Sequence, residues 1–158
     1  MDLETLKASL EAHPFLQGLP PQHIEKLVPL ASRVHFERDQ LIFKEGDESS
    51  FFYLLLSGKV TLEVPAPGKT FRIQTVGEGE ELGWSSFLSP VKKQFQARCV
   101  AAADALAFDG ARLLHECEQD PVFGYHLMRR VLKTVAERLQ ATRLQLLDVF
   151  KPVGAKML

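Results

Sequence analysis

Residues 79–98 carry the side chains whose types and spacing best suit ligand chemistry. They read GEELGWSSFLSPVKKQFQAR, which is a glycine-flanked acidic turn, a tryptophan, two serines and then a short basic and amide-rich run. A turn bounded by glycines and followed by hydroxyl and basic side chains is suited to holding an anion. The candidate ligand contacts in this stretch are Gly83, Trp84, Ser85, Ser86, Gln94, Phe95 and Arg98.

No catalytic or metal-binding pattern accompanies this stretch. The chain has no Ser-His-Asp order, paired carboxylates, Walker loop or dinucleotide fingerprint in the context that each requires. The triplet His115-Glu116-Cys117 places neighbours on different faces of a helix, so it is a weak ligand set. The two cysteines, Cys99 and Cys117, are too few for a disulfide framework and fit reduced thiols. We therefore expect neither an enzyme nor a metal site.

The composition points to one near-neutral cytoplasmic domain. With 158 residues, 19 basic against 20 acidic side chains and a net charge of −1, the chain lacks the broad positive field that non-specific nucleic-acid binding needs. The N-terminal segment MDLETLKASLEAH has no basic and apolar signal-peptide regions, and no apolar run approaches the length of a membrane span. We expect a cytoplasmic protein without membrane contact.

Three regions of different periodicity position the candidate stretch. Helical spacing is expected over about 2–31 and again over about 111–150. Between about 34 and 109 the chain breaks into strand-sized segments separated by turn residues, which is typical of an antiparallel roll or barrel. In this region Ser57-Gly58 separates FFYLLL from KVTLEV. The expected fold is α+β, a jelly-roll-like antiparallel β-roll between helices, in a single domain over 1–158.

The last helix carries an apolar stripe with alternating steps of three and four residues, as in the seam of a coiled coil. Its first half is equally suited to packing on the chain's own β-roll. Its second half would project beyond one small domain, so we expect a parallel two-fold homodimer through the stripe. The stripe comprises Tyr125, Met128, Leu132, Val135, Leu139, Thr142, Leu146 and Val149.

This arrangement resembles the cyclic nucleotide-binding domain of the catabolite-activator family over about residues 16–150. The resemblance rests on a glycine-aspartate turn at 43–47, an aromatic-rich strand with a Ser-Gly turn at 52–60, and Gly79 and Gly83. It implies a cassette in which a Gly-Glu pair opens a short helix toward a cyclic phosphate. It further implies that the glutamate accepts from the ribose hydroxyl, and that an arginine about ten residues later neutralises the phosphate.

This chain departs from that cassette at both side chains. When Gly83 is aligned with the cassette glycine, Trp84 replaces the glutamate and Gln94 replaces the arginine. A longer loop would bring in Arg98 instead, which shares one face of an extended strand with Gln94. If that face is the outer one, Arg98 is a solvated arginine, which is the favoured interpretation. The resemblance also gives Thr142, in the stretch RLQAT, a ligand-facing role.

Three functions follow as hypotheses. The first is a dimeric ligand-sensing regulatory module whose divergent cassette binds a small, neutral, flat or partly apolar ligand and not cAMP at high affinity. The second is a cyclic nucleotide-binding protein with compensating contacts. The third is a ligand-free interaction subunit, with a plugged pocket and a protein partner, of a redox complex of the hydrogenase type. Since only KPVGAKML follows Phe150, we expect a stand-alone member without a helix-turn-helix that does not itself bind DNA. No cofactor is certain.

Overall fold

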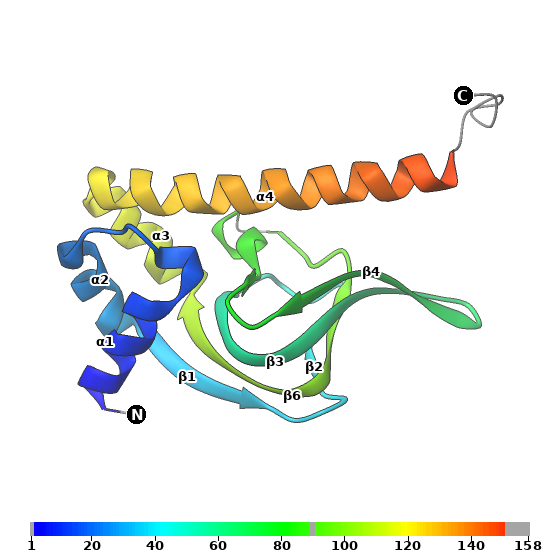
Figure 1. The fold of residues 1–158 in the computed structure, drawn as a ribbon, viewed down its shortest axis with the longest axis horizontal. Coiled ribbons are helices and arrows are strands. Elements are labelled where there is room, and N and C mark those ends of the chain that lie inside the picture. The colour runs from blue at the N-terminus through cyan, green and yellow to red at the C-terminus, as the bar shows by residue number, and fades with distance from the viewer. Residues whose placement is uncertain (1, 89–90, 151–158) are drawn as a thin grey trace.

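The computed structural model describes residues 2–88 and 91–150 (Figure 1). Helices stand at both ends of the chain and strands lie between them, so the predicted α+β class is confirmed. The helices are α1 (Leu3–Ala12), α2 (Pro21–Leu27), α3 (Gly110–Gln119) and α4 (Pro121–Val149), with the 3₁₀ turns η1 (Pro14–Leu16), η2 (Val28–Leu30) and η3 (Trp84–Leu88). The strands are β1 (Ala31–Phe36), β2 (Leu41–Phe43), β3 (Phe51–Ala66), β4 (Lys69–Gly77), β5 (Glu81–Leu82) and β6 (Gln96–Asp109).

The strands form one antiparallel sheet with the order β1-β6-β3-β4. Two short strands join it from the side, β2 on β6 and β5 on β3. In Figure 1 the long strands β3 and β6 curve around an interior, which gives the β-roll its shape. The roll begins three residues earlier than expected, at Ala31, because β1 pairs with the end of β6.

One predicted strand break does not interrupt a strand. FFYLLL and KVTLEV both lie within the single strand β3. Ser57-Gly58 is a bulge, because the register between β3 and β6 shifts on both sides of it. Gly58 has φ +94°, and a Cβ there would lie 2.5 Å from the carbonyl oxygen of Ala102. The turn residues of the sequence therefore bend a continuous strand at this point.

The buried apolar residues form two clusters. One lies between the helices and one end of the sheet and includes Leu10, Leu27, Phe52, Phe108 and Phe123. The other fills the roll and includes Phe43, Leu55, Val60, Leu82 and Cys99. The cassette stretch lies where the two clusters meet, since Phe87 belongs to the first cluster and Leu82 to the second.

Helix α4 begins at Pro121 and runs along one side of the roll (Figure 1). Asp120 caps its first turn by accepting from the Phe123 N–H at 3.2 Å, and Pro121 occupies the position where a missing amide hydrogen costs nothing. The face toward the domain is formed by the buried residues Phe123, Gly124, Leu127 and Thr134. This face lies beside the predicted stripe and is distinct from it.

The predicted stripe itself is mainly exposed in the single chain. Leu132 is 66% exposed and Val149 is 73% exposed, while Met128 and Val135 are half-buried. Helix α4 therefore has a packed face and a second apolar face that residues 2–88 and 91–150 leave mainly exposed. No helix in residues 2–88 and 91–150 combines the length and apolar composition that crossing a bilayer requires.

Candidate functional site

The cassette stretch turns sharply at Gly83. Strand β5 ends at Leu82 after pairing with β3, and η3 starts at Trp84. Gly83 has φ +90°, and a Cβ there would lie 2.3 Å from the carbonyl oxygen of Phe51. Only glycine combines this left-handed conformation with so close an approach to a neighbouring strand. Gly83 thus fixes where η3 begins and how closely the cassette lies against β3.

A cavity of about 130 Å³ lies between the cassette, the end of β2 and helix α4. Five of the predicted contacts line it. They come from the turn, from η3 and from the segment that leads into β6. The predicted residues at the cavity are Gly83, Trp84, Ser85, Gln94 and Phe95.

Three predicted contacts lie elsewhere. Ser86 is buried on the other side of η3 and lines a separate hollow of about 270 Å³. Arg98 pairs with Glu63 at 3.3 Å and donates to the Asp39 carbonyl oxygen at 3.1 Å. Thr142 is exposed on α4 and donates to the carbonyl oxygen of Arg138 at 2.9 Å. The structure of the single chain therefore brings none of the three to the cassette cavity.

Lys93 is a cavity residue that the sequence reasoning missed. Only 6% of it is exposed, its Nζ donates to Ser85 Oγ at 3.4 Å, and Nζ lies 4.1 Å from the centre of the Phe43 ring. Burial lowers the pKa of this ammonium to about 8. Lys93 precedes β6, which begins at Gln96, so strand periodicity gives no signal for it, although the structure shows Lys93 buried and its neighbour Gln94 exposed.

Arg138 is the second missed residue, and it comes from α4. Its side chain lines the cavity and pairs with Glu81 of β5 at 3.2 Å; it also donates to the Glu81 backbone carbonyl. The two side chains are only 13% and 12% exposed. Burial raises the pKa of Glu81 although Arg138 lies beside it. The cassette is therefore tied to the long helix through a largely desolvated ion pair.

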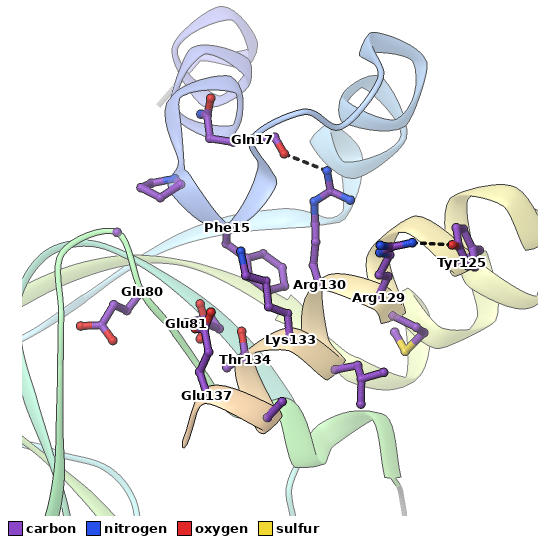
Figure 2. Close-up of a pocket in the computed structure, with 15 residues that line it drawn as sticks. Phe15, Gln17, Glu80, Glu81, Tyr125, Arg129, Arg130, Lys133, Thr134 and Glu137 are labelled. Atoms are coloured by element: carbon purple, nitrogen blue, oxygen red, sulfur yellow. Dashed lines mark hydrogen bonds between the residues drawn. The ribbon is translucent and has the colours of Figure 1, made fainter. Parts of the chain in front are cut away.

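A larger groove runs between α4, the η1 region and the turn before β5. Its volume is about 1,090 Å³, and Tyr125, Met128 and Leu132 of the predicted stripe line it. Figure 2 shows Glu80, Glu81 and Glu137 toward one end and Arg129 and Arg130 toward the other. The Arg129 guanidinium donates to the Tyr125 hydroxyl at 2.8 Å, and the Arg130 guanidinium donates to the Gln17 carbonyl at 2.8 Å. Because the stripe forms one wall, this groove belongs with the exposed face of α4.

The described residues contain no metal-type cluster. Within 2–88 and 91–150, no group of three or more histidine, cysteine or acidic side chains is placed to hold a metal ion. Cys99 and Cys117 are both buried and free. Burial raises the pKa of the Cys117 thiol to about 11, so this cysteine is not a reactive thiolate at neutral pH.

This geometry, a β-roll with a glycine-opened 3₁₀ turn beside a long C-terminal helix, agrees with the comparison with known families. The family model for the cyclic nucleotide-binding domain matches residues 33–120. The chain belongs to this family. The match covers the whole roll after the first residues of β1, the cassette and α3.

The relatives of this cyclic nucleotide-binding domain include regulators. A CRP-like cAMP-activated global transcriptional regulator from Mycobacterium tuberculosis is 26% identical over 134 residues, which is 84% of this chain and 58% of the regulator. The chain thus spans a little more than half the length of this curated relative. The homology supports a regulatory, ligand-sensing module.

Two solved structures have the same fold. A cyclic nucleotide-binding domain from Methylobacillus flagellatus aligns with a TM-score of 0.79 and 18% identity, covering 95% of this chain and 85% of that one. The catabolite activator protein of Thermus thermophilus aligns with a TM-score of 0.69 and 25% identity, covering 84% of this chain and 61% of that one. The Methylobacillus alignment leaves only about 5% of this chain uncovered, so that structure shares the β-roll and most of the flanking helices.

Proposed function

We propose that this chain is a single-domain, dimeric sensor in which a small ligand in the cassette cavity controls the position of α4. One observation carries the proposal. Arg138 lines the cavity and at the same time pairs with Glu81, so one side chain belongs to the ligand site and to the helix that would transmit the signal. A ligand that contacts Arg138 would favour one of two arrangements of α4. The proposed role is regulatory and cytoplasmic, without catalysis and without DNA binding by this chain.

The proposed ligand is not cAMP at high affinity. Trp84 and Gln94 replace the two cassette side chains that the family resemblance implies, and Arg98 is engaged by Glu63. Losing two contacts to charged or polar groups removes roughly 3–6 kcal/mol of binding free energy. The cavity of about 130 Å³ is also smaller than the roughly 300–1,000 Å³ of pockets that enclose larger ligands.

The proposed dimer uses the exposed stripe of α4. A second copy of the same helix would cover Leu132, Leu139 and Val149, which are at least half exposed in the single chain. The heptad-like spacing of these residues is suited to a parallel helix pair. The groove of Figure 2 would then lie at the edge of the dimer interface, because Tyr125 and Leu132 belong to both.

One observation favours the alternative that cyclic nucleotides bind through compensating contacts. Lys93 places a buried amine next to Gln94, in the cavity where the family arginine is absent. A lysine ammonium can act as a point charge for a phosphate, although without the two parallel hydrogen bonds of an arginine. Affinity for cAMP or cGMP decides between the two functions.

Calorimetry with cAMP and cGMP, combined with multi-angle light scattering, tests the proposal. We expect a dimer at micromolar concentration and dissociation constants for both nucleotides in the high micromolar range or weaker. Submicromolar binding that Thr142→Ala abolishes would establish the cyclic nucleotide alternative. A monomer would contradict the proposed use of α4, and a dimer that binds no small molecule would favour the interaction-subunit hypothesis.

A further inference from the structure

Lys93 is a buried cation for which the described part of the chain supplies no anion. Its Nζ reaches one hydroxyl, that of Ser85, and one aromatic face, that of Phe43. Burial lowers the pKa of this ammonium, and no carboxylate in residues 2–88 and 91–150 forms a salt bridge with it. Keeping an ammonium out of water without a counter-ion is costly, whereas a bound anion would remove that cost.

The other charged residues around the cavity do not compensate the positive charge of Lys93. Arg138 reaches the cavity from α4, but Glu81 already pairs with it. Lys92 also lines the cavity, but Lys92 is exposed to solvent. A ligand with a single negative charge would therefore complete the charge balance at Lys93.

The rest of the lining is mainly apolar and aromatic. Phe43, Trp84 and Phe95 contribute rings, and Leu88 and Val91 contribute aliphatic side chains. The Phe43 and Phe95 rings lie 5.8 Å apart. A fully polar anion would leave most of its oxygens facing carbon, so the occupant should have an apolar body as well as one charge.

The donors near Lys93 match a carboxylate. Lys93 Nζ and Ser85 Oγ lie 3.4 Å apart. The Ser85 hydroxyl also forms a hydrogen bond with the Ser49 hydroxyl, with 2.6 Å between the two Oγ atoms. Two donors suit the two oxygens of a carboxylate better than the three terminal oxygens of a phosphate monoester or the four oxygens of inorganic phosphate. In size, an apolar cavity of about 150 Å³ accommodates benzene. The cavity of about 130 Å³ therefore has room for a short-chain acid such as butyrate, whose heavy-atom count equals that of benzene.

We propose that the cassette cavity binds a small monocarboxylate, with its charged end at Lys93 and Ser85 and its hydrocarbon body against Phe43 and Phe95. This inference rests on the proposed sensor function, because it identifies the ligand class of the same cavity. The carboxylate would take the position at the cassette that a phosphate takes in the family resemblance, but with a lysine and a serine as donors.

Calorimetry of the full chain at pH 7 with sodium butyrate, butyramide and sodium phosphate tests this ligand class. Butyramide has the same shape as butyrate without the charge. We expect butyrate to bind at least ten times more tightly than butyramide and more tightly than phosphate. No detectable butyrate binding at millimolar concentration, or equal binding of butyramide, would overturn the proposal.

Lys93→Met removes the charge and keeps a chain of similar length, and Lys59→Met changes an exposed lysine on β3 as a control. We expect the first variant to weaken butyrate binding at least tenfold and the second to leave it unchanged. Unaltered binding by a folded Lys93→Met protein would contradict the assignment. For the case in which that variant does not fold, the wild-type protein is titrated across pH. Because the ammonium form binds, affinity should fall as pH rises above about 8.

Titration with cAMP separates this inference from the function on which it rests. Weak cAMP binding together with an absence of butyrate binding refutes the carboxylate ligand and leaves the sensor proposal standing. Submicromolar cAMP binding refutes the divergent ligand specificity, whatever butyrate does.

Discussion

Arg138 and Glu81 join the middle of α4 to the strand that leads into the cassette. Their charged groups lie 3.2 Å apart with side chains 13% and 12% exposed, and the Arg138 guanidinium also donates to the Glu81 carbonyl. Glu81 is two residues before Gly83, which lines the cavity and directly precedes η3. A movement of α4 cannot leave the cassette unaffected while this pair is intact.

Breaking the pair from the helix side should destabilise the fold. Arg138→Met leaves the Glu81 carboxylate buried without its cation, so the free energy of unfolding should fall by roughly 3–5 kcal/mol. Glu81→Gln in the Arg138→Met background should recover part of this loss, because it removes the buried unpaired charge. Urea unfolding at one fixed protein concentration measures both changes.

Arg143→Met is the matched control for Arg138→Met, because Arg143 is an exposed arginine of the same helix. It should change the free energy of unfolding by less than about 0.5 kcal/mol. Equal effects of the two arginine variants, or strictly additive effects of Arg138→Met and Glu81→Gln, would mean that the pair does not tie α4 to the cassette.

Gly83 should tolerate no side chain. Gly83→Ala would bring a Cβ to 2.3 Å from the Phe51 carbonyl oxygen at a φ of +90°. Gly46→Ala makes a matched control, since Gly46 has nearly the same φ, +89°, with nothing within 4 Å of the added Cβ. The control should lose about 1 kcal/mol from backbone strain alone, and Gly83→Ala should lose clearly more. Thermal and urea unfolding of both variants measure the difference, and similar losses would show that the close approach to β3 does not matter.

Much of the architecture follows from local sequence. The turn residues Asp120-Pro121 mark the start of α4, and the glycine at 83 marks the cassette turn. Ser57-Gly58 was interpreted wrongly as a break between strands, because a glycine pattern is the same for a turn and for a bulge. Only the pairing partner, β6, distinguishes the two.

The ligand site is harder to predict from the sequence than the architecture is. Gln94 occupies the place of the family arginine, whereas the buried cation is its neighbour Lys93, which lies in the irregular segment before β6, where no strand periodicity applies. The contact of Arg138 with Glu81 joins residues 57 positions apart and depends on how α4 docks on the roll. No local pattern encodes that docking.

The exposed stripe of α4 should hold the dimer together. Leu139→Glu places a charge in the middle of the stripe, where Leu139 is 50% exposed in the single chain. Leu144→Glu is the control, because Leu144 is 54% exposed on the same helix but lies off the stripe. Light scattering at micromolar concentration should find a monomer for Leu139→Glu and a dimer for Leu144→Glu. A dimer that resists Leu139→Glu, or one lost equally in both variants, would locate the interface elsewhere.

His13 should make the fold sensitive to mild acid. Its Nδ1 accepts from the Phe15 N–H at 3.2 Å and its Nε2 donates to the Leu55 carbonyl at 3.0 Å, so the neutral ring fills its site. Burial lowers the pKa of His13 below its ordinary value of 6.5. Between the two pKa values, the unfolded chain therefore carries a proton on His13 that the folded chain does not. The free energy of unfolding accordingly decreases as pH falls through about 6.5 toward the folded pKa. The slope from this one group is at most about 1.4 kcal/mol per pH unit.

Replacing His13 should remove that slope. The free energy of unfolding of His13→Asn should change less between about pH 7.5 and pH 5.5 than that of the wild type, even if its value at pH 7.5 is lower. His35 acts in the opposite direction, because its hydrogen bond to Asp104 raises its pKa, but it is present in both proteins and cancels in the comparison. If His13→Asn keeps the same slope as the wild type, proton uptake at His13 does not couple to unfolding, and the acid sensitivity must come from another group.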